Sequence, residues 1–202
     1  MEGKYFKKIV GQKCYLSPIS LDDADYFTGW LNDFSILMNL NSVSEIVTFE
    51  KEKELLKDLT NGYVFAIVDC EKNKLMGSIG LSNVDLINRT AEFGIMIGDR
   101  NFLNKGYGTE ATLLMLDFGF NILNLCHIHT KVYGFNQRAI KCYEKAGFKT
   151  VGKFSEYRQI AGERFDMHFM EILCKDFNNS LYIQKTFSDV KSGKTGLDLK
   201  LM

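Results

Sequence analysis

Hydrophobic residues in the middle of the chain follow two different periods, one after the other. Phe93, Ile95 and Ile97 alternate with other residues, which is the period of a β-strand, and the run at residues 98–101 interrupts this alternation. Beyond it the spacing changes to three and four residues, which predicts an α-helix that begins near Gly108. The apolar positions of this predicted helix are Ala111, Leu114, Met115 and Phe118. The pattern therefore predicts a strand, a turn and a helix.

The same analysis predicts further helices and strands along the rest of the chain. Strands are expected at residues 13–18, 63–68, 74–82 and 127–133, helices from Ser20, over 50–59 and from Asn136, and a last hairpin of strands 149–153 and 164–174 joined across 154–163. Residues 33–48 follow no clear period. Short turns join the middle strands, so these strands should form an antiparallel meander. This order predicts an α/β fold with a mixed sheet.

Some side chains of the N-terminal helices have predicted positions. In the helix at residues 50–59, Leu55, Leu56 and Leu59 are expected to face the core. Trp30 is also expected to pack in the core, because large aromatic side chains are mostly buried.

Two glycines stand at the start of the central helix. Gly106 and Gly108 let the backbone turn tightly and leave the amide groups of residues 105–109 unobstructed. The first turn of a helix has unsatisfied N–H donors and a partial positive charge, so these amides can hold a phosphate without a side-chain ligand. The alternative is that the glycines only permit the turn, since two glycines alone are a weak motif.

A second motif follows about thirty residues later. Asn136 is positioned to cap a short helix, and Ala139, Ile140 and Tyr143 share one face of that helix. Gly147 is positioned to end it. The two motifs together are far more specific than either alone.

With both motifs, the chain resembles the GNAT superfamily of N-acetyltransferases, in particular the branch of ribosomal-protein N-terminal acetyltransferases and spermidine acetyltransferases. Residues 105–111, 136–139 and 143–148 carry the resemblance, which extends over residues 11–176. One position departs from the family, because Leu103 stands where the phosphate loop often has Gln or Arg. Backbone amides make most contacts in such a loop, so cofactor binding should survive. The resemblance implies a GNAT-like mixed, mostly antiparallel sheet of about seven strands flanked by about four helices.

The resemblance also implies acetyl-CoA as co-substrate, without a metal ion. Its pyrophosphate is expected on the backbone of Lys105, Gly106, Tyr107, Gly108 and Thr109. Its pantetheine arm is expected between the strands at residues 92–98 and 127–133, which splay apart in this family. The further residues expected to contact the cofactor are Ile95, Met96, Ile97 and Asn136. A backbone N–H on the Met96 side of the strand is expected to polarise the thioester carbonyl.

Acetyl transfer needs a neutral amine and a proton for the departing thiolate. Tyr143 is the candidate acid, because a phenol with a pKa of about 10 can donate a proton and regain it from solvent, and the resembling family usually uses this tyrosine. Its alternative role is packing between helix and sheet. Glu92 is the candidate base for the acceptor ammonium, or else a partner of a nearby Lys or Arg. We interpret His127, His129 and His168 as ordinary strand histidines.

Composition restricts the class of partner. Lys plus Arg equals Asp plus Glu at 25 each, so no overall charge favours nucleic acid or an anionic membrane. The 5 cysteines are scattered without a C-x-x-C pair, which argues against a zinc site or a disulfide framework and favours a reducing cytoplasm. No signal peptide or membrane span is evident. Residues 1–177 are predicted to form one domain, and 178–202 a flexible or loosely docked tail.

The leading prediction is a cytoplasmic N-acetyltransferase that transfers an acetyl group from acetyl-CoA to a primary amine by direct attack in a ternary complex. The alternative is a non-catalytic CoA-binding regulatory or assembly module, and the presence of both Glu92 and Tyr143 argues against it. The motifs do not distinguish a protein N-terminus from a small-molecule amine such as a polyamine or an amino sugar. A monomer or homodimer is expected, without nucleic acid or membrane partners.

Overall fold

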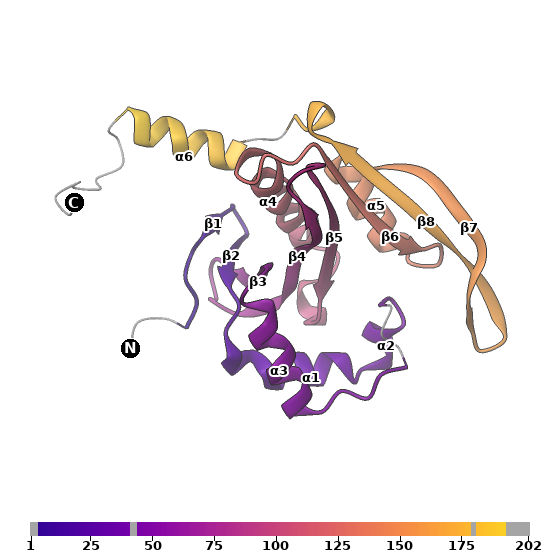
Figure 1. Ribbon diagram of the computed structural model, residues 1–202. Coiled ribbons are helices and arrows are strands. Elements are labelled where there is room, and N and C mark those ends of the chain that lie inside the picture. Colours follow the sequence, from indigo (N-terminus) through magenta and orange to yellow (C-terminus); the bar gives the residue numbers. More distant parts are fainter. Residues whose placement is uncertain (1–3, 41–43, 179–180, 193–202) are drawn as a thin grey trace.

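An eight-stranded sheet of order β1-β2-β3-β4-β5-β6-β8-β7 runs through the computed structural model (Figure 1). The structure describes residues 4–40, 44–178 and 181–192. The strands are β1 (Ile9–Val10), β2 (Cys14–Pro18), β3 (Tyr63–Asp69), β4 (Leu75–Asp85), β5 (Thr90–Ile97), β6 (His127–Tyr133), β7 (Lys149–Ile160) and β8 (Glu163–Leu173). The described helices are α1 (Ala24–Leu31), α2 (Phe34–Leu37), α3 (Phe49–Leu59), α4 (Tyr107–Asn121), α5 (Gln137–Ala146) and α6 (Leu181–Lys191). The predicted fold class is confirmed, with one more strand and two more helices than expected.

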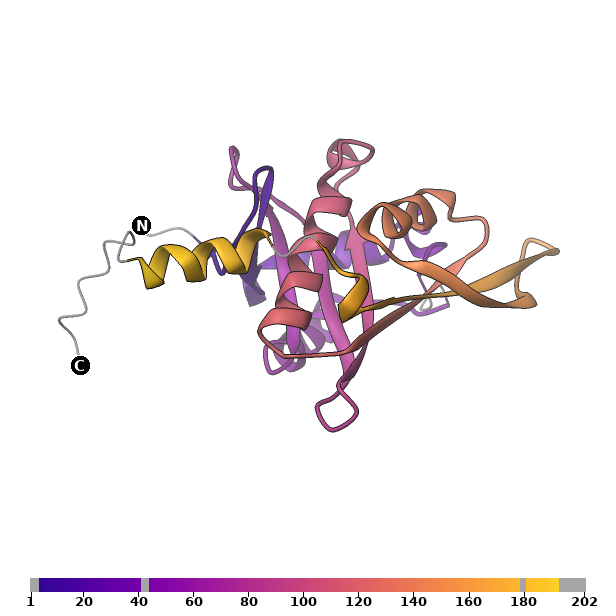
Figure 2. The same ribbon diagram turned by 90° about the horizontal axis from the view of Figure 1, so that it is seen from above.

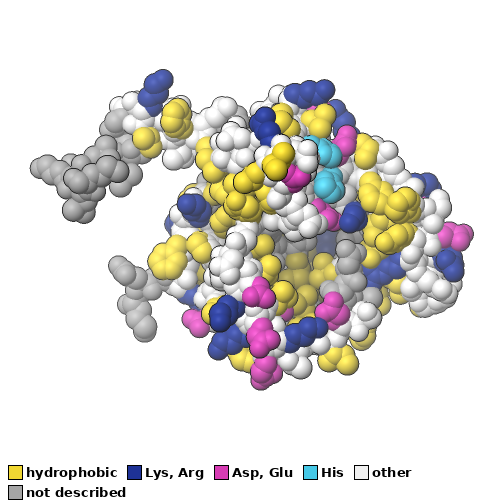
Figure 3. All heavy atoms as spheres, viewed as in Figure 1, with side chains coloured by type: hydrophobic (Ala, Val, Ile, Leu, Met, Phe, Trp, Pro, Cys, Tyr) yellow, Lys and Arg dark blue, Asp and Glu magenta, His cyan; other side chains and the backbone are white. Residues whose placement is uncertain are grey.

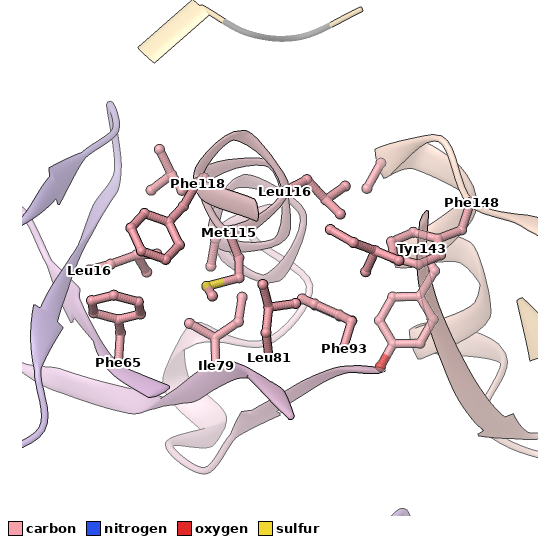
Figure 4. Close-up of a cluster of buried hydrophobic side chains, with 14 of the residues drawn as sticks. Leu16, Phe65, Ile79, Leu81, Phe93, Met115, Leu116, Phe118, Tyr143 and Phe148 are labelled. Carbon is pink, nitrogen blue, oxygen red and sulfur yellow. The ribbon is translucent and has the colours of Figure 1, made fainter. Parts of the chain in front are cut away.

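Side chains of the strands alternate between two apolar clusters, one on each face of the sheet. On β3, Phe65 and Ile67 belong to the cluster formed with α4 and α5, whereas Ala66 and Val68 belong to the cluster formed with α1 and α3. Figure 4 shows the first cluster, with Met115 of α4 above the strands. Helices therefore cover both faces of the sheet and hold its strands in place.

Helices α4 and α5 form as the sequence predicts. The predicted apolar positions of α4 are all buried, namely Ala111, Leu114, Met115 and Phe118. At the start of α5, the Asn136 side chain accepts a hydrogen bond from the Ala139 N–H at 3.1 Å. At its end, Gly147 adopts a left-handed conformation with φ of 103°. The two helices lie so close that a Cβ on Gly108 would stand 3.5 Å from the Cys142 Sγ.

The predicted meander is confirmed, and the next strand diverges from it. Strands β3, β4 and β5 pair antiparallel in sequence order. Strand β6 then pairs parallel with β5 only from Thr90 to Glu92. Just beyond, the Thr130 hydroxyl donates to the Phe93 carbonyl at 2.9 Å, and the two strands separate from there. The splay implied by the family resemblance is therefore present in this chain.

The last hairpin is longer than predicted, so the expected connection across residues 154–163 is wrong. Strands β7 and β8 stay paired up to Ile160 and Glu163, and only Ala161 and Gly162 form the turn, with φ of 50° and 88°. Two bulges in β7 interrupt its alternation, which explains why the sequence pattern did not extend through it. The hairpin projects from the body on the side opposite α6 (Figure 2).

Helix α3 differs from the prediction at one side chain. Leu56 is buried and Leu59 packs on the α1–α3 cluster, but Leu55 is 46% exposed, so its predicted inward position is wrong. Residues spaced by three and four share a helix face, and Glu52 takes the third inward position of this face. Trp30 packs on the same cluster, as expected.

The predicted tail contains helix α6, which docks through its first turn. The buried Asp117 carboxylate of α4 accepts hydrogen bonds from the N–H groups of Tyr182 at 3.2 Å and Ile183 at 2.9 Å. Both side chains pack on the α4 cluster, whereas Phe187 is exposed. Residues 179–180 and 193–202 of the predicted tail lie outside the described residues. In the described part of the chain, every helix is too short or too polar to span a membrane.

Candidate active site

The divergence of β5 and β6 opens the larger of two neighbouring cavities. This larger cavity has a volume of about 810 Å³ and is lined by residues of α2, β5, β6 and α5 and of the segment that leads into α4. The predicted cofactor residues that line it are Ile95, Met96, Ile97, Gly106, Gly108, Thr109 and Asn136. The side chains of Lys105 and Tyr107 are not among its lining, and the Tyr107 hydroxyl instead donates to the Asp69 carboxylate at 2.7 Å.

Backbone N–H groups at the start of α4 reach this cavity. Gly106 precedes the helix with φ of 86°, a conformation that favours glycine. The first N–H of the helix that donates to a helical carbonyl is that of Glu110, which bonds the Gly106 carbonyl at 3.1 Å. The amides of residues 107–109 come before it and have no preceding turn to pair with. The geometry therefore offers several donors for an anionic group.

Basic side chains surround the rest of the larger cavity, and no carboxylate of the described residues lines it. The basic residues are Arg100, Lys131, Arg138, Lys141 and Lys145. Arg138, Lys141 and Lys145 are spaced by three and four residues, so they share one face of α5. Arg100 is paired with Asp33 at 2.6 Å. The excess of cations and amide donors suits a ligand with several phosphates, such as CoA.

The free edge of β5 faces the larger cavity. The Phe93 carbonyl is directed toward β6, and backbone groups of a strand point to alternate sides, so the N–H and C=O groups of Ile95 and Ile97 point into the cavity. Those of Met96 point toward β4, as does the N–H of Gly98, which donates to a β4 carbonyl at 2.8 Å. The strand amides that face the larger cavity are therefore those of Ile95 and Ile97, on either side of Met96.

The smaller cavity lies against the first, on the face shown in Figure 3, where a hollow has hydrophobic side chains on its floor. Its volume is about 340 Å³, and strands β3 to β6 supply most of its lining. The residues that line both cavities are Asn39, Leu40, Ile95, Met96, Lys131 and Tyr143. Two ligands, one in each cavity, would therefore meet beside these residues.

Tyr143 lies at this junction with its ring buried and its hydroxyl directed away from the core cluster (Figure 4). The ring packs edge-on against Phe93 at 5.7 Å between centroids. Burial raises the pKa of the phenol well above its usual value, and the neighbouring Thr130 hydroxyl acts in the opposite direction. Tyr143 therefore keeps its proton at neutral pH, and the raised pKa makes the buried phenol a weaker acid than a free one.

Glu92 lines the smaller cavity and both of its carboxylate oxygens have partners. The Lys131 ammonium lies 3.1 Å from one oxygen, and the Asn83 side-chain amide donates to the other at 3.1 Å. Asn83 stands at a bulge in β4 and has φ of 50°. The sequence left open whether Glu92 is a base or a partner of a basic residue; it does have such a partner, and it also faces a cavity.

The strand histidines form a separate group beside Glu92. The Nε2 of His127 lies 3.0 Å from a Glu171 carboxylate oxygen, and the His127 and His129 rings stack at 5.5 Å. Burial lowers the pKa of His129, against the opposing effect of Glu92. Neither histidine lines either cavity. Among the described residues, no cluster of three His, Cys, Asp or Glu side chains is arranged to hold a metal ion.

Sequence reasoning missed several residues of these cavities. Arg138 and Lys145 could have been found, because they lie on one helix face with Lys141 and follow the predicted cap at Asn136. Asn83 lines neither cavity, but it donates to Glu92, and the sequence gave no indication of this contact because a bulge positions Asn83 there.

Comparisons with known proteins agree with this geometry. Residues 13–149 match the family described as Acetyltransferase (GNAT) domain. The chain is 32% identical over 161 residues to a spermidine N(1)-acetyltransferase of Vibrio cholerae. This match covers 73% of this chain and 91% of that protein. It is 25% identical to the mouse alpha/beta-tubulin-N-acetyltransferase 9, over 75% of this chain and 68% of that protein. A crystal structure of the Vibrio cholerae spermidine N-acetyltransferase with CoA and spermine superposes with a TM-score of 0.73, at 27% identity over 82% of this chain and 98% of that one.

Proposed function

The chain belongs to the GNAT acetyltransferase family and transfers an acetyl group from acetyl-CoA to an amine, and from this premise we propose which residues of the site carry the reaction. In the proposal, acetyl-CoA occupies the larger cavity and the acceptor amine occupies the smaller one. The observation that carries this assignment is that the two cavities adjoin at Ile95, Met96 and Tyr143.

The proposed orientation of acetyl-CoA follows from the positions of the donors. The amides of residues 105–109 hold the pyrophosphate, because unpaired N–H groups at a helix start favour anions. Arg138, Lys141 and Lys145 add positive charge along α5. The pantetheine arm then lies along the free edge of β5 and reaches toward Tyr143, with Asn136 available as a donor through its side-chain amide.

The chemistry proposed at the junction needs three groups of this chain. Glu92 accepts the proton of the acceptor ammonium, directly or through water, so that the neutral nitrogen can attack the thioester carbon. The N–H of Ile95 donates to the carbonyl oxygen as negative charge develops there, and the sheet fixes this amide in place beforehand. Tyr143 gives its proton to the sulfur as the carbon–sulfur bond breaks. The nitrogen, which became positively charged on attack, releases its extra proton to water to leave the neutral amide, and Tyr143 recovers a proton from solvent.

Replacement of Tyr143 by Phe tests the proposal. Tyr143→Phe removes the hydroxyl and keeps the ring that packs on Phe93. We expect turnover with acetyl-CoA and an acceptor amine to fall about 10²-fold, at the low end of general-acid effects because a thiolate is a tolerable leaving group. The affinity for CoA, measured by calorimetry on the same variant, should stay near wild type. Turnover within about twofold of wild type would leave Tyr143 as a packing residue.

A cytoplasmic location belongs to the proposal as well, as does a monomer or homodimer that acts without nucleic acid or a membrane. The support is the equal count of acidic and basic residues at 25 each and the free, scattered cysteines.

A further inference from the structure

The charges around the two cavities restrict which amine can be the acceptor. Among the described residues, Glu92 is the one carboxylate that lines either cavity, against five basic side chains in the larger one. Two other acidic residues close to the site are already paired, Asp33 with Arg100 at 2.6 Å and Glu171 with His127 at 3.0 Å. The lining of the smaller cavity therefore has no surplus of negative charge, because Glu92 and Lys131 are the charged ones among its described residues.

A polyamine carries several positive charges at neutral pH, and each charge taken from water into a cavity needs a partner. The smaller cavity offers one carboxylate, and Lys131 already neutralises it at 3.1 Å. The five cations of the larger cavity are assigned to the phosphates of acetyl-CoA in the proposed function, so they give a polycation no partner either. The spermidine N(1)-acetyltransferase of Vibrio cholerae is thus similar to this chain in family, but the charges here oppose an acceptor of that kind.

The pair of Glu92 and Lys131 matches a different acceptor. We propose that the acceptor is a monoamine that also carries an anionic group, a carboxylate or a phosphate, close to the reacting nitrogen. The ammonium of the acceptor takes the place of Lys131 beside Glu92, and the anion of the acceptor binds Lys131. The ion pair between Glu92 and Lys131 is thus replaced by two ion pairs with the acceptor. This inference rests on the proposed function, because it assumes that the smaller cavity holds the acceptor.

The positions of the two side chains support this exchange. Asn83 donates to one oxygen of Glu92 at 3.1 Å, which holds the carboxylate in place when Lys131 turns to a ligand. The Lys131 side chain is 40% exposed and Glu92 22%, so the pair stands at the mouth of the cavity and opens without disturbing the core. Lys131 also lines both cavities, which brings the acceptor beside the thioester. Lys131 is thus assigned as a specificity-determining residue.

Acceptors that differ only in the anion provide the test. An amino acid is compared with its carboxamide, and phosphoethanolamine with ethanolamine, by kcat/KM at saturating acetyl-CoA, with spermidine as a third arm. We expect the wild-type protein to prefer the anionic member of at least one pair by about tenfold, and to acetylate spermidine more slowly than that acceptor. The pair that shows the preference identifies the anion as carboxylate or phosphate.

Two variants separate a specific role of Lys131 from a general loss of charge. Lys131→Met should bring the anionic-to-neutral ratio to about one. Lys149→Met is the matched control, because it removes a lysine from another ion pair of 3.1 Å, with Asp176, outside both cavities, and it should keep the wild-type ratio. Thermal unfolding of both variants checks that they fold.

The outcomes distinguish this inference from the proposed function. Acetylation of amines with no preference for the anionic members, a spermidine rate above all others, or a ratio unchanged in Lys131→Met would overturn the inference and leave the proposed function in place. Binding of acetyl-CoA without acetylation of any amine would overturn both.

Discussion

The two cavities are built in different ways, although they meet at the same residues. The larger one takes its proposed phosphate-binding groups mainly from two short segments, the helix start at residues 106–109 and helix α5 with its cap at Asn136, while α2, β5 and β6 line the rest of it. The smaller one takes its lining from β3, β4, β5 and β6, with residues between Asn39 and Tyr143. A group bound by backbone amides and one helix face can be recognised in a local pattern. A cavity assembled from four strands depends on register and bulges, so its chemistry is set by contacts distant in sequence.

Among these substitutions, we expect the largest effect from one that obstructs the backbone amides of the proposed acetyl-CoA site. Gly108→Val puts a branched side chain beside Cys142, at the wall of the larger cavity where the amides of the helix start lie. We expect the affinity for CoA to fall about ten- to a hundredfold, equivalent to one or two charge-assisted hydrogen bonds. Calorimetric titration with CoA measures the change. Gly29→Val is the control, because Gly29 lies in α1 with no neighbouring atom within 4 Å of an added Cβ. Equal CoA affinity in folded Gly108→Val and Gly29→Val proteins would remove the phosphate site from the helix start.

A substitution of Glu92 should lower the reaction rate with the acceptor amine and leave the binding of CoA unchanged. Glu92→Gln keeps the shape of the side chain and removes its negative charge, so we expect kcat/KM for the acceptor to fall about tenfold at neutral pH with CoA affinity unchanged. The loss should shrink as the pH approaches the pKa of the acceptor amine, because the amine then arrives without its proton. A pH profile of kcat/KM measures this, and a loss that is constant over the whole range would argue against a role in deprotonation.

A change outside both cavities should affect stability and neither binding function. Burial raises the pKa of the Glu52 carboxyl from 4.5 to about 7, and one of its oxygens has no hydrogen-bond partner among the described residues. Since the folded protein holds this proton more tightly, the contribution of Glu52 to stability falls as the pH rises from about 4.5 to 7.

We therefore expect Glu52→Gln to be more stable than wild type at pH 8 by on the order of 2 kcal/mol, and close to wild type near pH 4. Urea unfolding at the two pH values measures the difference. A variant that is less stable at both would show that the carboxylate has a favourable partner in the folded state.

Local patterns were enough to predict the central part of the fold. The strand that becomes β5, the apolar face of α4 and the caps of α5 at Asn136 and Gly147 all follow from residues close in sequence. The family resemblance added the divergence of β5 and β6, which no spacing could give, because it depends on where two distant strands stop pairing at Phe93 and Thr130.

The errors occurred where tertiary contacts decide the outcome. Bulges hid the length of β7, and the register of β5 against β4 decides which backbone amides of β5 face the larger cavity. The ion pair of Glu92 with Lys131 depends on the alignment of β5 with β6, so the sequence could offer it only as one of two alternatives. Side chains that share one helix were thus easier to predict from the sequence than contacts between side chains of different strands.

A crystal structure with CoA and an acceptor amine tests the central claim most directly, namely that the two cavities hold the two substrates and meet at Tyr143. The proposal predicts the pyrophosphate within about 3 Å of amides at residues 105–109, the thiol close enough to the Tyr143 hydroxyl for a hydrogen bond, and the amine beside Glu92. A cofactor sulfur far from Tyr143, or an acceptor that enters through the larger cavity, would contradict the proposal.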